Sequence, residues 1–471
     1  MFELHHLSAQ EQWDWLQRRE ISPLELAEHY LARIERLDPS LGAFTTVTVD
    51  RALERARALQ DAGPTTAPLW GLPSGDKDLY RRAGVRTTMG SRLFENDVPD
   101  YSDEIVETMD AAGAVSLGKT SSPEFGLSSY TESLVAAPAR TPWNTALGAG
   151  GSSGGAAVAV AAGLLPFAPG SDGGGSIRIP AAATGLVGLK PSRGRIPSGT
   201  GLTSLGGLAV PGPIARTVSD AAMLLDALVA GGPYPYALRA PAWDGGAYLN
   251  AAVRGEGRFQ IGVMTSSPWD NTFDITISDE AKAALAVAIT ELDAVGHGIE
   301  QFALEPDDSY APAFRSLWQA SAAGIPAEGE RLELVEPLTR WLIARGRELG
   351  ARDLQQVLLT LTAYERSIIR QFSSYDAVLT PALALTPRPV GWYDQTDAER
   401  NFAQQCQYTP WTSFVNVSGL PAIVLPVHQT DDGLPMGVQL IGRPGREDVL
   451  LAIGAQLERR LAWQRRHPAS W

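Results

Sequence analysis

The feature that most constrains this 471-residue chain is a glycine-rich loop that leads directly into an apolar segment. Residues 170–180 read Gly-Ser-Asp-Gly-Gly-Gly-Ser-Ile-Arg-Ile-Pro, so three consecutive glycines stand immediately before Ser176. Glycines let a backbone approach another group closely, and such a loop can point several amide N–H groups toward one place beside a hydroxyl. A flexible surface loop is the alternative, but the apolar run at 181–189 indicates that the loop enters a core. The loop therefore predicts an oxyanion-binding site beside a serine nucleophile.

Lysine usage gives a second indication of chemistry. Among the 39 basic residues only four are lysines, at positions 77, 119, 190 and 282, and the first three lie in the glycine- and serine-rich stretch 71–212. Burial can make a lysine neutral near pH 7, whereas arginine stays protonated. Lys77, Lys119 and Lys190 are therefore candidates for a neutral base.

Two neighbouring serines satisfy the Gly-x-Ser-x-Gly pattern of the nucleophile elbow in Ser-His-Asp esterases. They are Ser152 and Ser153, within Gly150–Gly155. A triad in that chain order needs a later histidine, which His297, His428 or His467 would have to supply. Residues 145–149, just before the serines, lack the apolar strand that an elbow requires, and His297 and His428 are expected to bond local backbone groups. A Ser-His-Asp esterase is therefore a minor alternative.

Residues 113–120 match the phosphate-binding pattern G-x-x-x-x-G-K-[ST]. A nucleotide-binding loop of that kind follows a strand and opens a helix. Here residues 103–112 have a helical pattern and 114–117 a strand pattern, so the order is reversed. We therefore do not expect nucleotide binding.

Strand and helix patterns alternate along the chain without a repeat at a fixed period. Predicted helices cover the first sixty residues, including a capped helix from Ser22 that contains Leu26, Tyr30 and Ile34, and residues 156–168, 281–295, 331–372 and 447–463. Predicted strands cover 259–264, 377–379 and a hairpin, 422–427 with 437–441, turning at 431–433, while 232–257 has the composition of a connector. This pattern predicts an α/β fold with a single large mixed β-sheet enclosed by helices.

The chain carries 53 acidic against 39 basic residues, for a formal net charge of −14. A negative surface field repels phosphate backbones and anionic lipid headgroups, so neither nucleic acid nor membrane is expected as a partner. The lone cysteine, Cys406, excludes an intramolecular disulfide and a multi-thiolate metal site, and it is expected to be a small core residue. Residues 1–16 interleave charged and apolar side chains and lack a secretory signal pattern. Together these features indicate a cytoplasmic protein.

Taken together, the motifs resemble those of the amidase signature family of serine amidohydrolases. The resemblance runs through Gly71-Leu72-Pro73, Lys77-Asp78, Gly118–Thr120, Pro123–Gly126, Gly150–Gly155, Gly170–Pro180, Gly188–Pro191, Thr380-Pro381, Asn416, Gly419–Ala422 and Gly433–Pro435. It covers nearly the whole chain except about 225–370, and the C-terminal block also resembles bacterial acylamidases and 6-aminohexanoate-cyclic-dimer hydrolases. The resemblance implies one amidase domain over 1–471. We divide it into an N-terminal helical flank (1–62), a signature core (63–220), a variable substrate-pocket region (221–370) and a C-terminal part (371–471) that completes the core.

The resemblance also implies the catalytic roles. Ser176 would be the nucleophile, Ser152 a second serine preceded by a cis peptide bond, and Lys77 the base. The amides of Gly173, Gly174, Gly175 and Ser176 would form the oxyanion hole, and the reaction would pass through an acyl-enzyme without a metal or organic cofactor. Two positions depart from the family pattern: Gly173 stands where threonine is common, and Asp76 precedes Lys77. A carboxylate near Lys77 would favour its charged form, but in an extended segment Asp76 points to the opposite face.

The substrate is predicted from aromatic residues and from the absence of an evident cationic clamp. Candidate wall residues are Tyr130, Trp143, Ser153, Trp318, Trp411 and Phe414. We expect a small-molecule or oligomeric amide with an apolar or aryl acyl group, including oligoamides and carbamates, and a monomer or homodimer.

Two alternatives concern the role of the protein rather than its fold. One is the glutamine-hydrolysing subunit of a tRNA-dependent amidotransferase, which would require partner subunits, although the segment 120–125 is more similar to stand-alone amidases. The other is a non-catalytic binding protein on the same scaffold, and the presence of all three catalytic positions disfavours it.

Overall fold

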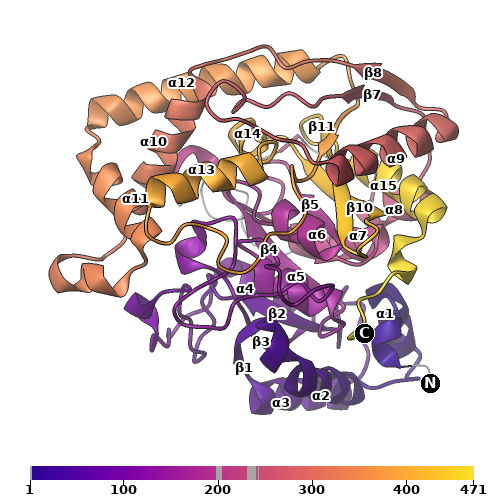
Figure 1. The fold of residues 1–471 in the computed structure, drawn as a ribbon. Helices are drawn as coiled ribbons and strands as arrows, with labels where there is room; N and C mark the ends of the chain where they lie inside the picture. Colours follow the sequence, from indigo (N-terminus) through magenta and orange to yellow (C-terminus); the bar gives the residue numbers. More distant parts are fainter. Residues whose placement is uncertain (1–2, 198–203, 231–239, 242) are drawn as a thin grey trace.

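The structure is a computed structural model that describes residues 3–197, 204–230, 240–241 and 243–471 (Figure 1). Its main element is an eight-stranded mixed sheet with the strand order β4-β6-β5-β10-β11-β9-β7-β8. The strands are β4 (Phe167–Asp172), β5 (Val187–Lys190), β6 (Val210–Ala215), β7 (Gln260–Val263), β8 (Gly298–Gln301), β9 (Ala377–Pro381), β10 (Ala422–Gln429) and β11 (Pro435–Gly442). Neighbours pair antiparallel from β4 to β9, and β9, β7 and β8 pair parallel. The predicted α/β class with a large mixed sheet enclosed by helices is confirmed.

A second, three-stranded sheet lies beside the first and has the order β1-β3-β2. Its strands are β1 (Phe44–Val47), β2 (Pro73–Lys77) and β3 (Val115–Thr120). The prediction of one sheet was incomplete because periodicity along the chain does not reveal which strands pair. The small sheet matters for function, since β2 packs against β4 of the large sheet and carries Lys77 at its last position.

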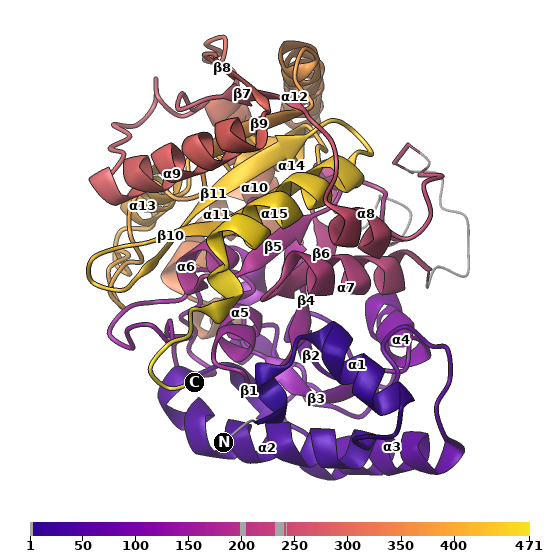
Figure 2. The same ribbon diagram turned by 90° about the vertical axis from the view of Figure 1, so that its right-hand side faces the viewer.

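Helices surround both sheets. They are α1 (Ala9–Gln17), α2 (Pro23–Leu41), α3 (Val49–Ala62), α4 (Glu104–Ala111), α5 (Gly154–Ala161), α6 (Arg178–Thr184), α7 (Val218–Ala230), α8 (Tyr248–Arg254), α9 (Asp279–Val295), α10 (Tyr310–Ala322), α11 (Pro337–Glu348), α12 (Ala351–Phe372), α13 (Ala398–Tyr408), α14 (Ser413–Val417) and α15 (Glu447–Leu461). In Figure 2, α7, α8, α9 and α15 lie in front of the large sheet and α10 and α11 lie behind it, while α2 and α3 lie below the small sheet. Among the described helices, none is both long and apolar enough to span a bilayer.

The expected helix at 156–168 is shorter in the structure. Every residue of α5 is buried, but the helix ends at Ala161, and Phe167 and Ala168 belong to β4. Gly163 has a φ of +64°, and Pro166 offers no backbone N–H, so a helix cannot continue through this segment. The apolar run is therefore a buried helix followed by a buried strand.

Most other predicted elements are present with shifted ends. Ser22 caps α2, whose buried side chains include Leu26, Tyr30 and Ile34. Strands β7 and β9, the hairpin β10–β11 and helices α9 and α15 stand where they were predicted, and α11 and α12 fill the segment 331–372 together with a short 3-10 helix. In the predicted connector 232–257, residues 232–239 and 242 lie outside the described residues, and α8 occupies part of the rest.

The apparent phosphate-binding motif lies in β3 and follows α4. The order is helix then strand, as the sequence indicated. Lys119 Nζ donates to the carbonyl oxygen of Tyr80 and to Thr87 Oγ1, within the small-sheet region. The arrangement of a nucleotide-binding loop is therefore absent from this segment.

Candidate active site

Lys77 is fully buried at the end of β2, and its amino group lies among three serine hydroxyls. The Nζ atom is 2.7 Å from Ser152 Oγ, 2.9 Å from Ser153 Oγ and 2.9 Å from Ser171 Oγ. The first two serines immediately precede α5, and Ser171 belongs to β4. Two segments of the signature core therefore meet at one lysine on the small sheet.

The electrostatic surroundings favour a neutral Lys77. Burial lowers the pKa of Lys77 to about 7, and the carboxylate of Asp172 opposes that shift. The neighbouring Asp76 is directed elsewhere, because it pairs with Arg82 at 2.6 Å and accepts a hydrogen bond from Ser116 Oγ at 2.8 Å. The extended backbone thus places the two side chains in different surroundings, as predicted.

The other two lysines of the glycine-rich region do not contact the serines. Lys119 bonds within the small-sheet region, and Lys190 Nζ donates to the carbonyl oxygen of Pro191 at 3.0 Å. Of the three candidate bases, Lys77 is the one that the fold brings to Ser152. The peptide bond between Gly151 and Ser152 is cis.

Asp172 organises the glycine loop from inside the core. This fully buried carboxylate accepts hydrogen bonds from the amides of Gly175 (2.8 Å) and Ile177 (3.1 Å) and pairs with Arg178 at 2.8 Å. Asn416 Nδ2 adds a further bond at 2.8 Å. The charge of Arg178 and these hydrogen bonds hold the pKa of Asp172 well below its usual range, against the effect of burial. Asp172, Arg178 and Asn416 all stand within the family motifs, but their residue types and spacing alone had indicated no role for them.

The loop presents unpaired amides next to Ser176. The Gly175 amide is occupied by Asp172, whereas the amides of Gly173, Gly174 and Ser176 donate to no protein atom among the described residues. The carbonyl oxygen of Ser176 accepts from the Ser153 amide at 3.1 Å, so the loop lies next to the serine pair. Of the four predicted oxyanion donors, three are therefore available and Gly175 is engaged elsewhere.

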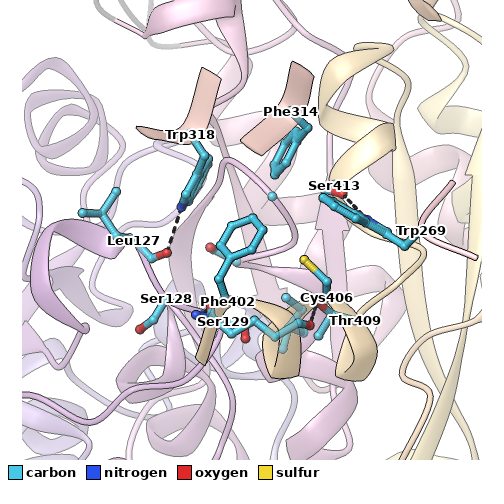
Figure 3. Close-up of a pocket in the computed structure, with 14 residues that line it drawn as sticks. Leu127, Ser128, Ser129, Trp269, Phe314, Trp318, Phe402, Cys406, Thr409 and Ser413 are labelled. Carbon is cyan, nitrogen blue, oxygen red and sulfur yellow. Dashed lines mark hydrogen bonds between the residues drawn. The ribbon is translucent and has the colours of Figure 1, made fainter. Parts of the chain in front are cut away.

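A pocket opens above Ser176 (Figure 3). It is lined by Leu127, Ser128, Ser129, Gly174, Ser176, Ile179, Trp269, Phe314, Trp318, Phe402, Gln405, Cys406, Thr409 and Ser413. None of these fourteen residues is charged, and four are aromatic. Two of the aromatic rings are fixed by hydrogen bonds, from Trp318 Nε1 to the Leu127 carbonyl oxygen and from Trp269 Nε1 to Ser413 Oγ. The pocket suits a neutral, apolar group.

Of the predicted wall residues, only Trp318 lines this pocket. Tyr130 accepts a hydrogen bond from Asn401 in the core, and Trp143 lies at a separate, small pocket with His428. Trp411 and Phe414 are fully buried, and Ser153 faces Lys77. None of these five residues lines this pocket, and an aromatic residue has the same sequence pattern in a core as in a pocket wall. The structure instead adds Trp269, Phe314, Phe402 and the buried Cys406, for which the sequence offered no position-specific signal.

The Ser-His-Asp arrangement is not assembled. His297 Nδ1 accepts from the Phe259 amide at 3.0 Å, and its Nε2 bonds Gln456 at 2.7 Å, so this histidine has the local role predicted for it. His428 lies at the separate small pocket. No described histidine lines the pocket at Ser176 or hydrogen-bonds Ser152 or Ser176.

The sequence of the chain matches a known protein family. Residues 25–451 match the family model described as Amidase. A putative amidase of Mycobacterium tuberculosis is 39% identical over 454 residues, covering 94% of each chain. The chain belongs to the amidase signature family. It is therefore an amide-hydrolysing enzyme.

Solved structures extend the likeness of this amidase to the whole fold. The 6-aminohexanoate cyclic dimer hydrolase complexed with substrate aligns with a TM-score of 0.90 and 31% identity, covering 99% of this chain and 100% of that one. A bacterial aryl acylamidase aligns with a TM-score of 0.85 and 27% identity, with 98% of each chain covered. A glutamyl-tRNA(Gln) amidotransferase subunit from a Roseiflexus species is also similar, at 34% identity over 99% of this chain and 98% of its own length.

Proposed function

We propose that this amidase hydrolyses linear carboxylic amides with an apolar or aryl acyl group through an acyl-enzyme on Ser176. The observation that carries the proposal is the buried Lys77, hydrogen-bonded to Ser152 beside the loop of Ser176, together with the uncharged pocket that Ser176 helps to line. The 6-aminohexanoate cyclic dimer hydrolase and the aryl acylamidase, both named for amide substrates, support it.

Acylation begins with neutral Lys77 as the base. Ser176 Oγ attacks the carbonyl carbon of the amide, its proton passes to Ser152 Oγ, and the proton of Ser152 passes to Lys77 Nζ. The carbonyl oxygen becomes an oxyanion that accepts hydrogen bonds from the free amides of the glycine loop. Backbone donors that already point at the developing charge need no reorganisation during the reaction.

The leaving amine then takes a proton before it departs. The Lys77 ammonium returns a proton through Ser152 to the leaving nitrogen, and the C–N bond breaks, because an amine anion is too poor a leaving group to depart unprotonated. Water attacks the acyl-enzyme with the same proton relay, giving the carboxylic acid and free Ser176.

The pocket supports an apolar acyl group over glutamine. Glutamine carries an α-ammonium and an α-carboxylate, and burying either without an opposite charge costs several kcal/mol. Among the fourteen lining residues none is charged. The glutamine-hydrolysing subunit therefore remains the second candidate function, favoured only by its sequence similarity to this chain.

Steady-state hydrolysis of acyl 4-nitroanilides tests the proposal. Acetyl, butanoyl and benzoyl 4-nitroanilides are compared by 4-nitroaniline release, and glutamine by ammonia release. We expect kcat/KM to be higher for the butanoyl and benzoyl amides than for the acetyl amide, with glutamine poorest.

Three variants test the catalytic assignment in the same assay. We expect Ser176→Ala and Lys77→Ala to lower kcat by about 10³-fold or more. We expect His428→Gln, the control for a Ser-His-Asp triad, to leave kcat unchanged. Faster turnover of glutamine than of the anilides would favour the amidotransferase role, and normal turnover by Ser176→Ala would contradict the mechanism.

A further inference from the structure

We propose that Ser171 and Ser153 are positioning residues that hold the two N–H bonds of neutral Lys77 and thereby turn its lone pair toward Ser152. The inference deepens the proposed function and rests on it, because it concerns the proton path of that reaction. The observation behind it is the set of oxygen atoms around one amino group. These atoms differ in whether they can give or only take a proton.

A neutral lysine amine has two N–H donors and one lone pair. Four oxygen atoms surround Lys77 Nζ: the hydroxyls of Ser152 (2.7 Å), Ser153 (2.9 Å) and Ser171 (2.9 Å), and the backbone carbonyl oxygen of Ser171 (3.4 Å). A carbonyl oxygen only accepts. The amine can act as a base only toward a hydroxyl that directs its own proton at Nζ, so the other bonds of each hydroxyl decide which serine that is.

The hydroxyl of Ser153 is already engaged as a donor. Ser153 Oγ donates to the carbonyl oxygen of Ser171 at 3.3 Å and accepts from the Ser171 amide at the same distance. With its proton directed at Ser171, Ser153 can only accept from Lys77. One N–H of the neutral lysine is thereby assigned to Ser153.

Ser171 takes the second N–H. Lys77 Nζ donates to the hydroxyl of Ser171 at 2.9 Å and to its carbonyl oxygen at 3.4 Å. The carbonyl oxygen can only accept a proton, so an N–H of the lysine rather than its lone pair is directed at this residue. Ser171 therefore offers two oxygen atoms that accept from Lys77, and both belong to the strand that leads into the glycine loop.

Ser152 is the hydroxyl that remains. Among the described residues its Oγ hydrogen-bonds Lys77 alone, so its proton is free to point at the lysine lone pair. The transfer then balances: the O–H bond of Ser152 breaks as an N–H bond forms at Lys77, and Ser152 regains a proton from Ser176. This proton inventory selects Ser152 over the adjacent Ser153 as the relay, independently of any motif.

The test is the pH profile of kcat and kcat/KM for Ser171→Ala on one anilide. Without the Ser171 hydroxyl as an acceptor, the lone pair of Lys77 is no longer held toward Ser152. Misalignment of a reacting group slows a reaction, and we expect kcat to fall about tenfold to 100-fold. The charged ammonium loses an acceptor too, so the acid limb should move to lower pH. KM should stay unchanged, since Ser171 does not line the pocket.

Two further variants separate positioning from folding. Ser171→Thr keeps the hydroxyl and should restore kcat and the acid limb. Ser74→Ala is the matched control, because Ser74 lies on the same strand as Lys77 and its buried hydroxyl has no hydrogen-bond partner in the part of the chain that the structure describes. It should leave both profiles unchanged. An unchanged kcat for Ser171→Ala, or a lower kcat with an unmoved acid limb and no rescue by Ser171→Thr, would overturn the positioning role.

This outcome is distinguishable from failure of the proposed function. If Ser176→Ala and Lys77→Ala lose turnover while Ser171→Ala behaves as wild type, only the positioning role fails. If Ser176→Ala or Lys77→Ala keeps normal turnover, the proposed mechanism itself fails.

Discussion

Lys77 is the base of the proposed mechanism, and its surroundings lead to a prediction about the pH dependence of turnover. Burial lowers its pKa to about 7, and only the neutral form can accept the proton of Ser152. The active fraction therefore rises as pH increases through about 7 and falls below it. We expect kcat/KM for an acyl anilide to rise about tenfold per pH unit below the midpoint and to level off above pH 8. A profile that is flat from pH 5 to 8 would contradict a lysine base with this pKa.

Asp172 accepts hydrogen bonds from amides of the glycine loop, and its replacement should affect stability as well as rate. Asp172→Asn removes the charge that pairs with Arg178, whose side chain is also fully buried. An uncompensated buried charge costs about 3–5 kcal/mol, so the free energy of unfolding should fall by about that amount in urea denaturation. The exposed Asp61→Asn at the end of α3 is the matched control and should change it by less than about 0.5 kcal/mol. Equal stability of the two variants would argue against this role of Asp172.

The motifs predicted the residue types of the candidate site but not the contacts between them. The glycine run and the scarcity of lysine indicated an oxyanion loop and a neutral base, and the family resemblance selected Lys77, Ser152 and Ser176. The engagement of the Gly175 amide by Asp172 is a matter of three-dimensional geometry, which no spacing reveals. The wall aromatics could not be predicted, since a core tryptophan such as Trp411 and a pocket tryptophan such as Trp318 have the same chemistry.

Helix α10 contributes two of the four aromatic residues that line the pocket at Ser176. It carries Phe314 and Trp318, whose rings stack with centroids 5.7 Å apart. We expect Trp318→Ala to raise KM for the benzoyl anilide about tenfold or more, because a buried aromatic surface worth about 1.5–3 kcal/mol is lost. The effect on the acetyl anilide should be smaller.

The matched control for this helix is Trp143→Phe. Trp143 lies at the separate small pocket and donates to the Thr184 carbonyl oxygen at 2.8 Å, so its replacement should leave both KM values unchanged. Equal effects of Trp318→Ala on the two substrates would contradict the assignment of this pocket to the acyl group.

Elements were predicted best where local signals were strong. The capping box at Ser22 and the hairpin around 431–433 place α2 and the pair β10–β11 without tertiary information. Sheet membership was not predictable in this way. Strands β2 and β3 pair parallel with each other and join the small sheet, because pairing depends on contacts between segments far apart in the chain.

At the scale of the whole molecule, the two ends of the described chain meet. His5 and Trp471 pack with ring centroids 5.1 Å apart, and both views show the termini in the same region (Figures 1 and 2). His5 is buried, and its Nδ1 lies 3.1 Å from His29 Nε2. Burial, followed by the charge of Arg33, lowers the pKa of His5 to about 2. Protonation of His5 therefore makes the free energy of unfolding depend on pH.

Because the pKa of His5 is lowered in the folded chain, His5 makes the fold less stable as the pH falls. Above about pH 6.5 His5 is neutral in both the folded and the unfolded chain, so its contribution to stability is complete. As pH falls from about 6.5 toward 2, only the unfolded chain takes up the proton, and stability is lost. Between pH 7 and pH 5 the wild type should lose about 1–2 kcal/mol more than His5→Phe in urea denaturation. Identical losses in the two proteins would show that His5 does not titrate in this way.

The most direct test of the central claim is the intact-protein mass after reaction with a fluorophosphonate, which labels an activated serine without prior choice of substrate. The Oγ–P bond forms as fluoride leaves, so one adduct per chain is expected for the wild type, with peptide mapping to Ser176. Ser176→Ala should show no adduct and Lys77→Ala almost none, while Ser74→Ala should label like the wild type. An adduct that survives Ser176→Ala, or that maps to Ser152 or Ser153, would contradict the account.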